Sequence, residues 1–342
     1  MVVGQIVRHM TAHGAAGSQM RARSGPITLG VPDGRLHAAP TLVALGRGWF
    51  ERYQLDVQPV PAGSHRTGVP RLAAGEFDVS PQAPLLGFFQ LFDPQRPMLM
   101  VADQGSVRPG RGEAAIVARP ALIETGALAD YADLRGKRLG LSPVRGDHDW
   151  LTFAAALRTG GLTFDDVEVV ICDFGDARHE AFRTGAIDVG TVNRLGSLME
   201  GRESGAFVVW RHEHEFRQRQ ERAIVFSYPF WSERQEDAYT FVEAYLAGLR
   251  EYYRAFEEGV EREAVARVLA ERSGEPVEAI LGEMIPMAVD PDGHLNVSAI
   301  EADLDWLQRQ GLLERRVAVD DFVDDRYREA ALAKLGRYHP TD

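Results

Sequence analysis

The sequence predicts an α/β protein of two lobes, each built on a mostly parallel sheet flanked by helices, with a ligand cleft between them. Its length of 342 residues suits two domains better than one. Between residues 27 and 192, short apolar strands alternate with helical stretches, which is typical of βαβ units. From about residue 232 onward, apolar residues recur at helical spacing. We expect this last part to form helices that cover the lobes rather than a third domain.

The alternation of strands and helices starts after a polar lead-in. Residues 1–26 are rich in Gly, Ala, His and Arg and contain no apolar stretch of signal-peptide length, so we expect them to be disordered. Pro40 then opens a helix that ends before Gly46, because glycine favours the end of a helix. In this first part we expect strands at 27–31, 55–57 and 77–79, and helices at 41–45 and 69–74.

The same alternation returns further along the chain. Strands are expected at 114–118, 134–141, 168–172, 187–189 and 222–226, and helices at 150–158 and 177–183. The C-terminal helices are expected at 237–256, 263–272, 277–284, 297–310 and 324–335.

Composition and charge exclude several kinds of protein. The formal net charge of −12 disfavours a nucleic-acid partner, which needs a basic face. No run of 18 apolar residues is present, so no membrane span is expected. The single cysteine, Cys172, excludes a multi-cysteine metal or iron–sulfur site. The only lysines, Lys137 and Lys334, lie in a turn-like segment and near the C-terminus, which disfavours Schiff-base chemistry.

Three phrases of the sequence carry a resemblance to a known family. The first is the segment 36–50, LHAAPTLVALGRGWF, followed by Leu-Asp-Val at 55–57. The second is LAAGEFDV at 72–79, and the third is DLRGKRLGL at 133–141. In this order they resemble the type II periplasmic-binding-protein fold over residues 27–338. More narrowly, they resemble the nitrate/sulfonate/taurine-type substrate-binding proteins of ABC transporters, together with their thiamin-pyrimidine-precursor and desulfinase-like relatives.

The resemblance implies how the chain divides and what it does. Lobe 1 would be discontinuous, at 27–113 plus 227–338, with lobe 2 at 114–226 and strands 114–118 and 222–226 as crossovers. The implied function is to bind a small anionic or polar organic molecule, such as a sulfonate, carboxylate or heterocycle, as the substrate-binding protein of an importer. The alternatives are a cofactor-free enzyme of decarboxylase or desulfinase type, cleaving C–C or C–S bonds, and a sensor without catalysis.

Candidate ligand-binding residues follow from the rule that ligands of such sheets lie at the carboxyl ends of strands, beside helix N-termini that favour anions. The side chains expected there are Asp33, Arg35, His37, Ser64, His65, Arg66, Ser80, Gln82, Ser142, Arg145, Gly146, Asp147, His148, Asp173, Asn193, Arg194 and Tyr228. Either Arg35, Arg66 and Arg194 clamp an anion, or each is an ordinary surface arginine.

The segment 142–150, SPVRGDHDW, is the most unusual of these loops because it is crowded with charge. In the simpler interpretation its aspartates only cap the following helix. In the functional one, Arg145 and His148 hold a carboxylate, sulfonate or phosphate while Asp147 orients His148. If the protein is an enzyme, we expect the catalytic groups to be His37, His65, His148 and Arg145, since histidine exchanges protons near neutral pH.

Partners and location follow from the same observations. A small-molecule ligand is expected, with an ABC permease as partner if the protein serves an importer, and no nucleic acid. The segment His212-Glu213-His214 could bind metal, but nothing completes a ligand set, so we expect no metal or cofactor. Without a leader the chain is expected in the cytoplasm; with a missing upstream leader it would be extracytoplasmic.

Overall fold

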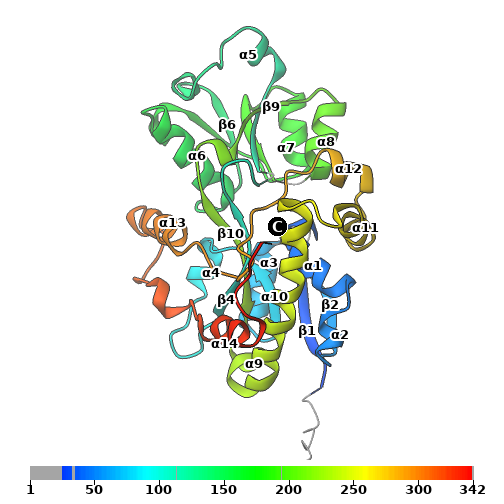
Figure 1. Ribbon diagram of the computed structural model, residues 1–342. Helices are drawn as coiled ribbons and strands as arrows, with labels where there is room; N and C mark the ends of the chain where they lie inside the picture. The colour runs from blue at the N-terminus through cyan, green and yellow to red at the C-terminus, as the bar shows by residue number, and fades with distance from the viewer. Residues whose placement is uncertain (1–24, 33–34, 113, 194, 341–342) are drawn as a thin grey trace, which may run out of the picture.

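The computed structural model describes residues 25–32, 35–112, 114–193 and 195–340, with Arg35 described by its backbone only. Residues 1–24 of the expected lead-in (1–26), together with Asp33 and Arg194, therefore lie outside the described residues. Two five-stranded sheets carry the fold, in the strand orders β2-β1-β3-β10-β4 and β7-β6-β8-β5-β9. Figure 1 shows the second sheet in the upper part of the molecule and the first sheet below it.

The first sheet is mixed. Strand β1 pairs in parallel with β2 and β3, whereas β10 runs antiparallel to both β3 and β4. Its strands are β1 (Ile27–Pro32), β2 (Val57–Gly63), β3 (Val79–Gln82), β4 (Leu99–Val107) and β10 (Arg219–Phe226). Strand β4 was not expected from the sequence. It is buried along its whole length and includes Asp103, Gln104 and Ser106, which interrupt the apolar pattern of a strand.

The second sheet repeats this arrangement. Strand β6 pairs in parallel with β7 and β8, and β5 runs antiparallel to β8 and β9. Its strands are β5 (Ala115–Ala118), β6 (Arg138–Leu141), β7 (Glu168–Ile171), β8 (Val189–Val192) and β9 (Val208–His212). The expected two-lobed α/β fold is thus confirmed. The antiparallel pairs in each sheet arise because the chain passes between the sheets twice, after β4 and before β10.

Helices cover both sheets (Figure 1). Those associated with the first sheet are α1 (Ala39–Gly46), α2 (Trp49–Arg52), α3 (His65–Ala73), α4 (Leu86–Gln90), α9 (Tyr228–Glu233) and α10 (Gln235–Glu257). Those inserted between strands of the second sheet are α5 (Pro120–Glu124), α6 (His148–Thr159), α7 (Asp176–Arg183) and α8 (Leu195–Glu203). The C-terminal helices are α11 (Arg262–Ser273), α12 (Val277–Gly282), α13 (Val297–Arg309) and α14 (Arg326–Leu335).

The long helix α10 is the centre of the largest apolar core. Its apolar face packs against α1 at a close approach, where a Cβ built on Gly248 would lie 2.4 Å from the Cβ of Ala44. Tyr245 on the same helix is fully buried and donates a hydrogen bond to the carbonyl oxygen of Asp103 in β4. Helix α10 therefore packs in the same apolar core as strands of the first sheet.

Strand pairing does not by itself test the boundaries of the two lobes. It places β10, which includes residues 222–226, in the first sheet and β5 in the second. The division into 27–113 plus 227–338 and 114–226 therefore stays a prediction about which parts move together. Within the described residues, no helix is both long enough and apolar enough to cross a membrane.

Candidate functional site

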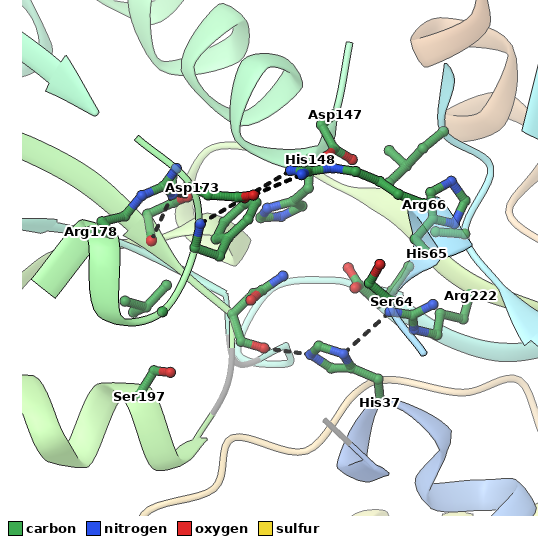
Figure 2. A pocket seen from close by; sticks show the side chains of 18 of the residues that line it. His37, Ser64, His65, Arg66, Asp147, His148, Asp173, Arg178, Ser197 and Arg222 are labelled. Carbon is green, nitrogen blue, oxygen red and sulfur yellow. Dashed lines mark hydrogen bonds and ion pairs between the residues drawn. The ribbon is translucent and has the colours of Figure 1, made fainter. Parts of the chain in front are cut away.

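A cavity of about 290 Å³ lies between the two sheets. Its wall combines cationic, acidic and polar side chains with a few apolar ones. The lining residues are His37, Ser64, His65, Arg66, Ala83, Leu85, Asp147, His148, Asp173, Phe174, Gly175, Arg178, His179, Thr191, Val192, Asn193, Ser197, Arg219, Glu221 and Arg222. Figure 2 shows side chains from both lobes converging on this space.

The topology explains why these residues meet. His37 follows β1, Ser64 follows β2 at the start of α3, and Ala83 follows β3. In the other lobe, Asp147 follows β6 at the start of α6, and Asp173 follows β7. The carboxyl ends of parallel strands form the ligand edge of an open sheet, and here two such edges face each other.

In the first lobe, a chain of hydrogen bonds holds the His65 ring. The side-chain amide of Gln82 donates to Ser80 Oγ at 2.9 Å, and Ser80 donates to the carbonyl oxygen of Gly30 at 2.7 Å. This leaves Gln82 Oε1 to accept from His65 Nδ1 at 3.2 Å. Burial, with a smaller contribution from nearby Arg222, lowers the pKa of His65 to about 3. His65 is therefore neutral over the physiological range, with its proton on Nδ1.

His37 joins the two lobes beside the cavity. Arg222 on β10 donates from Nη2 to His37 Nδ1 at 3.3 Å, so Nδ1 is the acceptor and Nε2 the donor nitrogen of the ring. That nitrogen donates to the backbone carbonyl oxygen of Asn193, at the end of β8. Figure 2 shows both contacts at the lower edge of the cavity. His37 thus orients the guanidinium of Arg222 while fixing the second lobe.

In the second lobe, Asp149 is a buried centre of hydrogen bonds. Its carboxylate accepts from the backbone nitrogen of Ser142 at 2.6 Å and from Ser142 Oγ at 2.9 Å. It also accepts from Arg178 Nη2 at 2.8 Å. Arg178 further donates to the side chain and carbonyl oxygen of Thr191. These contacts hold Arg178 in the wall between the ends of β6 and β8.

A second buried centre is Glu213, just behind the cavity wall. It accepts hydrogen bonds from His148, Thr152, Arg217 and Arg219. Burial alone would raise the pKa of Glu213, but Arg219 and His148 outweigh it and lower that pKa well below its usual value. Burial and the charge of Arg219 lower the pKa of His148, although Glu213 opposes this shift.

Among the described residues, one group has the atoms to hold a metal ion: His148, Glu213 and Glu221, whose potential ligand atoms lie within 4.8 Å of one another. Arg219 pairs with both carboxylates of this group. A guanidinium thus already compensates their charge, and a metal ion would have to displace it. The segment His212-Glu213-His214, which was considered as a metal site from the sequence but not favoured, is arranged differently: the rings of His212 and His214 stack on each other, and Glu213 bonds to His148.

Eight of the residues expected from the sequence line the cavity: His37, Ser64, His65, Arg66, Asp147, His148, Asp173 and Asn193. Three others lie behind it. Ser80 and Gln82 support His65, and Ser142 binds Asp149. Arg35, Asp33 and Arg194 cannot be placed, since the structure does not describe their side chains.

Three expected residues do not line the cavity. A Cβ on Gly146 would lie within 3.2 Å of Leu307, Leu86 and Leu312, so this loop packs onto α13 and α4. Arg145 therefore points outward and donates to Gln310 at 2.8 Å. Tyr228 begins α9 and packs against Trp231 instead.

The sequence reasoning missed the charged side chains of β10 and α7. Arg219, Glu221 and Arg222 line the cavity from β10, and Arg178 and His179 line it from α7. For the residues of β10, the sequence did contain a signal. The segment 219–222 is entirely polar and directly precedes the apolar residues 223–226 of one strand, all of which is buried. Buried charge in a strand is costly, so it indicates a site or an ion-pair network.

The comparisons with known proteins agree with this fold. A family model described as NMT1/THI5 like matches residues 119–258. The periplasmic aliphatic sulphonate binding protein SsuA from Escherichia coli is similar in structure, with a TM-score of 0.67 and 18% identity over 86% of this chain and 96% of that one. The search of curated proteins finds no match.

Two further solved structures show the same architecture. The periplasmic nitrate-binding protein NrtA from Synechocystis PCC 6803 has a TM-score of 0.67 and 14% identity over 91% of this chain and 89% of that one. The desulfurization enzyme DSZB has a TM-score of 0.63 and 15% identity over 91% of this chain and 99% of that one. These matches confirm the resemblance that the sequence phrases indicated. The chain therefore has the two-lobed fold of the periplasmic sulfonate- and nitrate-binding proteins, and its residues 119–258 match the NMT1/THI5-like family.

Proposed function

We propose that this protein binds a small anionic or polar organic molecule, of the sulfonate, carboxylate or heterocycle class, in the cavity between its lobes. One observation carries the proposal: four arginines and four imidazoles converge with hydroxyl and amide groups on a single cavity at the strand ends of both sheets. Guanidinium groups bind carboxylates and sulfonates through charge-assisted hydrogen bonds.

The cavity offers two kinds of polar contact. Arg222, held by His37, supplies a cationic group in the first lobe. Ser64, Ser197 and Thr191 supply hydroxyl groups that suit the polar part of a heterocycle or acid. We propose that Arg222 meets the anionic group of the ligand and that the hydroxyl groups select its remainder. Phe174 and Leu85 provide apolar surface for a short carbon skeleton.

The volume of the cavity supports a small ligand. About 290 Å³ is at the lower end of the range for small-molecule pockets. The solved SsuA from Xanthomonas axonopodis pv. citri, an alkanesulfonate-binding protein, has MOPS bound, with a TM-score of 0.62 and 19% identity to this chain. We propose a ligand of similar size or smaller.

A second candidate function is cofactor-free catalysis, favoured by the likeness to the enzyme DSZB and by neutral imidazoles in the cavity wall. His148 is paired with Glu213 through Nε2, an arrangement that orients an imidazole for proton transfer. Of the four expected catalytic residues, His37, His65 and His148 line the cavity, whereas Arg145 points outward to Gln310.

The test combines native mass spectrometry of freshly purified protein with calorimetric titration of ethanesulfonate, benzoate and uracil. Arg222→Gln should weaken binding of a charged hit by about tenfold or more, since a hydrogen bond to a charged group is worth about 1.5–3 kcal/mol. The control is Arg309→Gln, an exposed substitution on α13. Saturable binding of unchanged ligand supports the carrier function, and turnover that is lost in His148→Gln supports the enzyme. A hit whose affinity is the same in Arg222→Gln contradicts the role of Arg222.

We further propose that an ABC permease receives the ligand and that the protein acts outside the cytoplasm, by analogy with the SsuA and NrtA proteins that are described as periplasmic. Cell fractionation of the native strain tests the location. Recovery in the cytoplasmic fraction would favour the enzyme or a sensor.

A further inference from the structure

Arg66 makes ion pairs with two carboxylates across the cleft. It lies in the first turn of α3 in the first lobe, and its guanidinium reaches two carboxylates of the second lobe. Nη1 and Nη2 bind the two oxygens of Asp173 at 2.9 Å each, and Nε binds Asp147 Oδ2 at 3.1 Å. The paired contact to Asp173 is the bidentate geometry that makes arginine–carboxylate pairs specific.

The two carboxylates differ in their surroundings. The Asp173 side chain is 49% exposed, and the hydrogen bonds from Arg66 lower its pKa. The Asp147 side chain is 11% exposed, and burial together with nearby Asp149 raises its pKa although Arg66 opposes this. The exposed half of the contact is therefore open to screening by salt, whereas the buried half is protected.

These carboxylates come from separate loops of the second lobe. Asp147 precedes α6, and Asp173 follows β7. One guanidinium thus fixes both loops relative to α3. His37 makes a second contact across the cleft beside the cavity, through the carbonyl oxygen of Asn193, in addition to contacts elsewhere such as that of Arg145 with Gln310. Figure 2 shows Arg66 and His37 on opposite sides of the space, so that the cavity lies between the two connections.

We propose that Arg66 is a latch that holds the lobes closed through protein contacts alone, independently of the ligand. Every atom in the contact belongs to the protein, so its free energy favours the closed arrangement before any ligand binds. This has a consequence for ligand affinity. A ligand that binds only the closed form has an apparent affinity proportional to the fraction of closed molecules, so a stronger latch raises that affinity. The latch also predicts that raising the salt concentration opens the lobes.

Distance measurements between spin labels on the two lobes, made without ligand, test the latch directly. Labels at Gln95→Cys and Glu124→Cys, both exposed, report on the first and second lobes in a Cys172→Ser background. Arg66→Gln should lower the ratio of closed to open molecules by about fivefold, as expected for a well-formed, partly exposed ion pair. In the labelled protein that keeps Arg66, raising NaCl from about 0.05 M to about 0.5 M should also lower the ratio of closed to open molecules, but to a smaller extent.

Two more variants separate the latch from a general loss of structure. Asp173→Asn removes the bidentate partner at an exposed position and should open the lobes as Arg66→Gln does. Arg71→Gln, on the same helix, removes an ion pair to Glu76 within the first lobe and should leave the distances unchanged. If the distances between the two labels are the same in Arg66→Gln, in Asp173→Asn and in the labelled protein that keeps both residues, the latch is overturned. Because no ligand is added, that result would leave the proposed binding function untouched.

Discussion

Arg178 and Asp149 form an ion pair at 2.8 Å in which both side chains are almost completely removed from solvent, at 1% and 0% exposure. The pair joins α7 to the first turn of α6, and its Arg178 lies in the wall of the cavity. Removing one partner of such a pair leaves an uncompensated buried charge, which costs far more than the net worth of the pair.

The first prediction is that Arg178→Met lowers the free energy of unfolding by about 3–5 kcal/mol, because the Asp149 carboxylate loses its cation in a buried site. Urea denaturation at neutral pH measures this change. The control is Arg183→Met on the same helix, which breaks an exposed pair with Glu180 and should change stability by less than about 1 kcal/mol. Similar losses in both variants would contradict the structural role of the buried pair.

From the sequence, the edge of the fold that faces the ligand could be predicted, but the ion pair between Arg178 and Asp149 could not. The segment 142–150 was expected either to cap its helix or to hold an anion through Arg145 and His148, yet Asp149 is used internally and Arg145 points outward. Both facts depend on three-dimensional packing: the loop folds against α13 and α4, which are separated from it by many residues of chain. By contrast, the positions of His37, His65 and Asp173 followed from strand order alone, because the carboxyl ends of strands meet at one edge.

The second prediction concerns the pH dependence of stability. The pKa of His65 is lowered from 6.5 to about 3, chiefly by burial, so between these values the unfolded chain binds a proton that the folded protein does not. The stability contributed by His65 is therefore fully present above pH 6.5 and is lost as the pH falls toward 3, at roughly 1.4 kcal/mol per pH unit at most.

Substituting His65 by Gln should flatten this part of the curve of unfolding free energy against pH. His339→Gln, at an exposed position near the C-terminus, is the matched control and should leave the slope as it is. Thermal unfolding in a series of buffers from about pH 7 to about pH 4.5 gives the slopes. An unchanged slope in His65→Gln would show that another group carries the acid sensitivity.

The third prediction concerns Asp103, which is fully buried in β4. One oxygen accepts from the backbone of Gly105 and the side chain of Gln220, and the other accepts from the backbone of Asp290. In Asp103→Asn an amide N–H must face one of these donors, which should cost about 1–3 kcal/mol. Asp305→Asn, at an exposed site on α13, is the control and should have little effect.

This cost should also change with pH in a defined direction. Burial raises the pKa of Asp103 from 3.8 to about 6, although the hydrogen bond from Asp290 opposes the shift. The folded protein therefore binds the extra proton between these values, and the stability contributed by Asp103 is lost as the pH rises through 6. The difference between the unsubstituted protein and Asp103→Asn should be larger at about pH 4.5 than at about pH 7.5. A difference that grows with pH would contradict this assignment.

An element can be predicted from the sequence where an apolar pattern determines it, and is missed where contacts with distant parts of the chain determine it. Helix α10 was predicted within two residues at each end because apolar residues recur along it at helical spacing. Strand β4 was missed because its buried residues Asp103, Gln104 and Ser106 satisfy their polar groups with distant partners such as Tyr245 and Gln220. The charges of β10 were missed as well: the polar run 219–222 before the apolar residues 223–226 was a signal, but that these charges are buried beside Glu213 is seen only in the fold.

The fourth prediction uses two glycines in helices whose surroundings differ. A Cβ at Gly248 would lie 2.4 Å from the Cβ and 2.6 Å from the Cα of Ala44, so Gly248→Ala must push α10 and α1 apart. Overpacking of this kind typically costs about 1–3 kcal/mol. A Cβ at Gly282, the last residue of α12, would meet nothing within 4 Å, so Gly282→Ala should be neutral or stabilising by up to about 1 kcal/mol, because alanine has less backbone freedom to lose on folding. Urea denaturation of the two variants side by side makes the comparison. A Gly248→Ala protein as stable as Gly282→Ala would mean that α1 and α10 are not packed as closely as described.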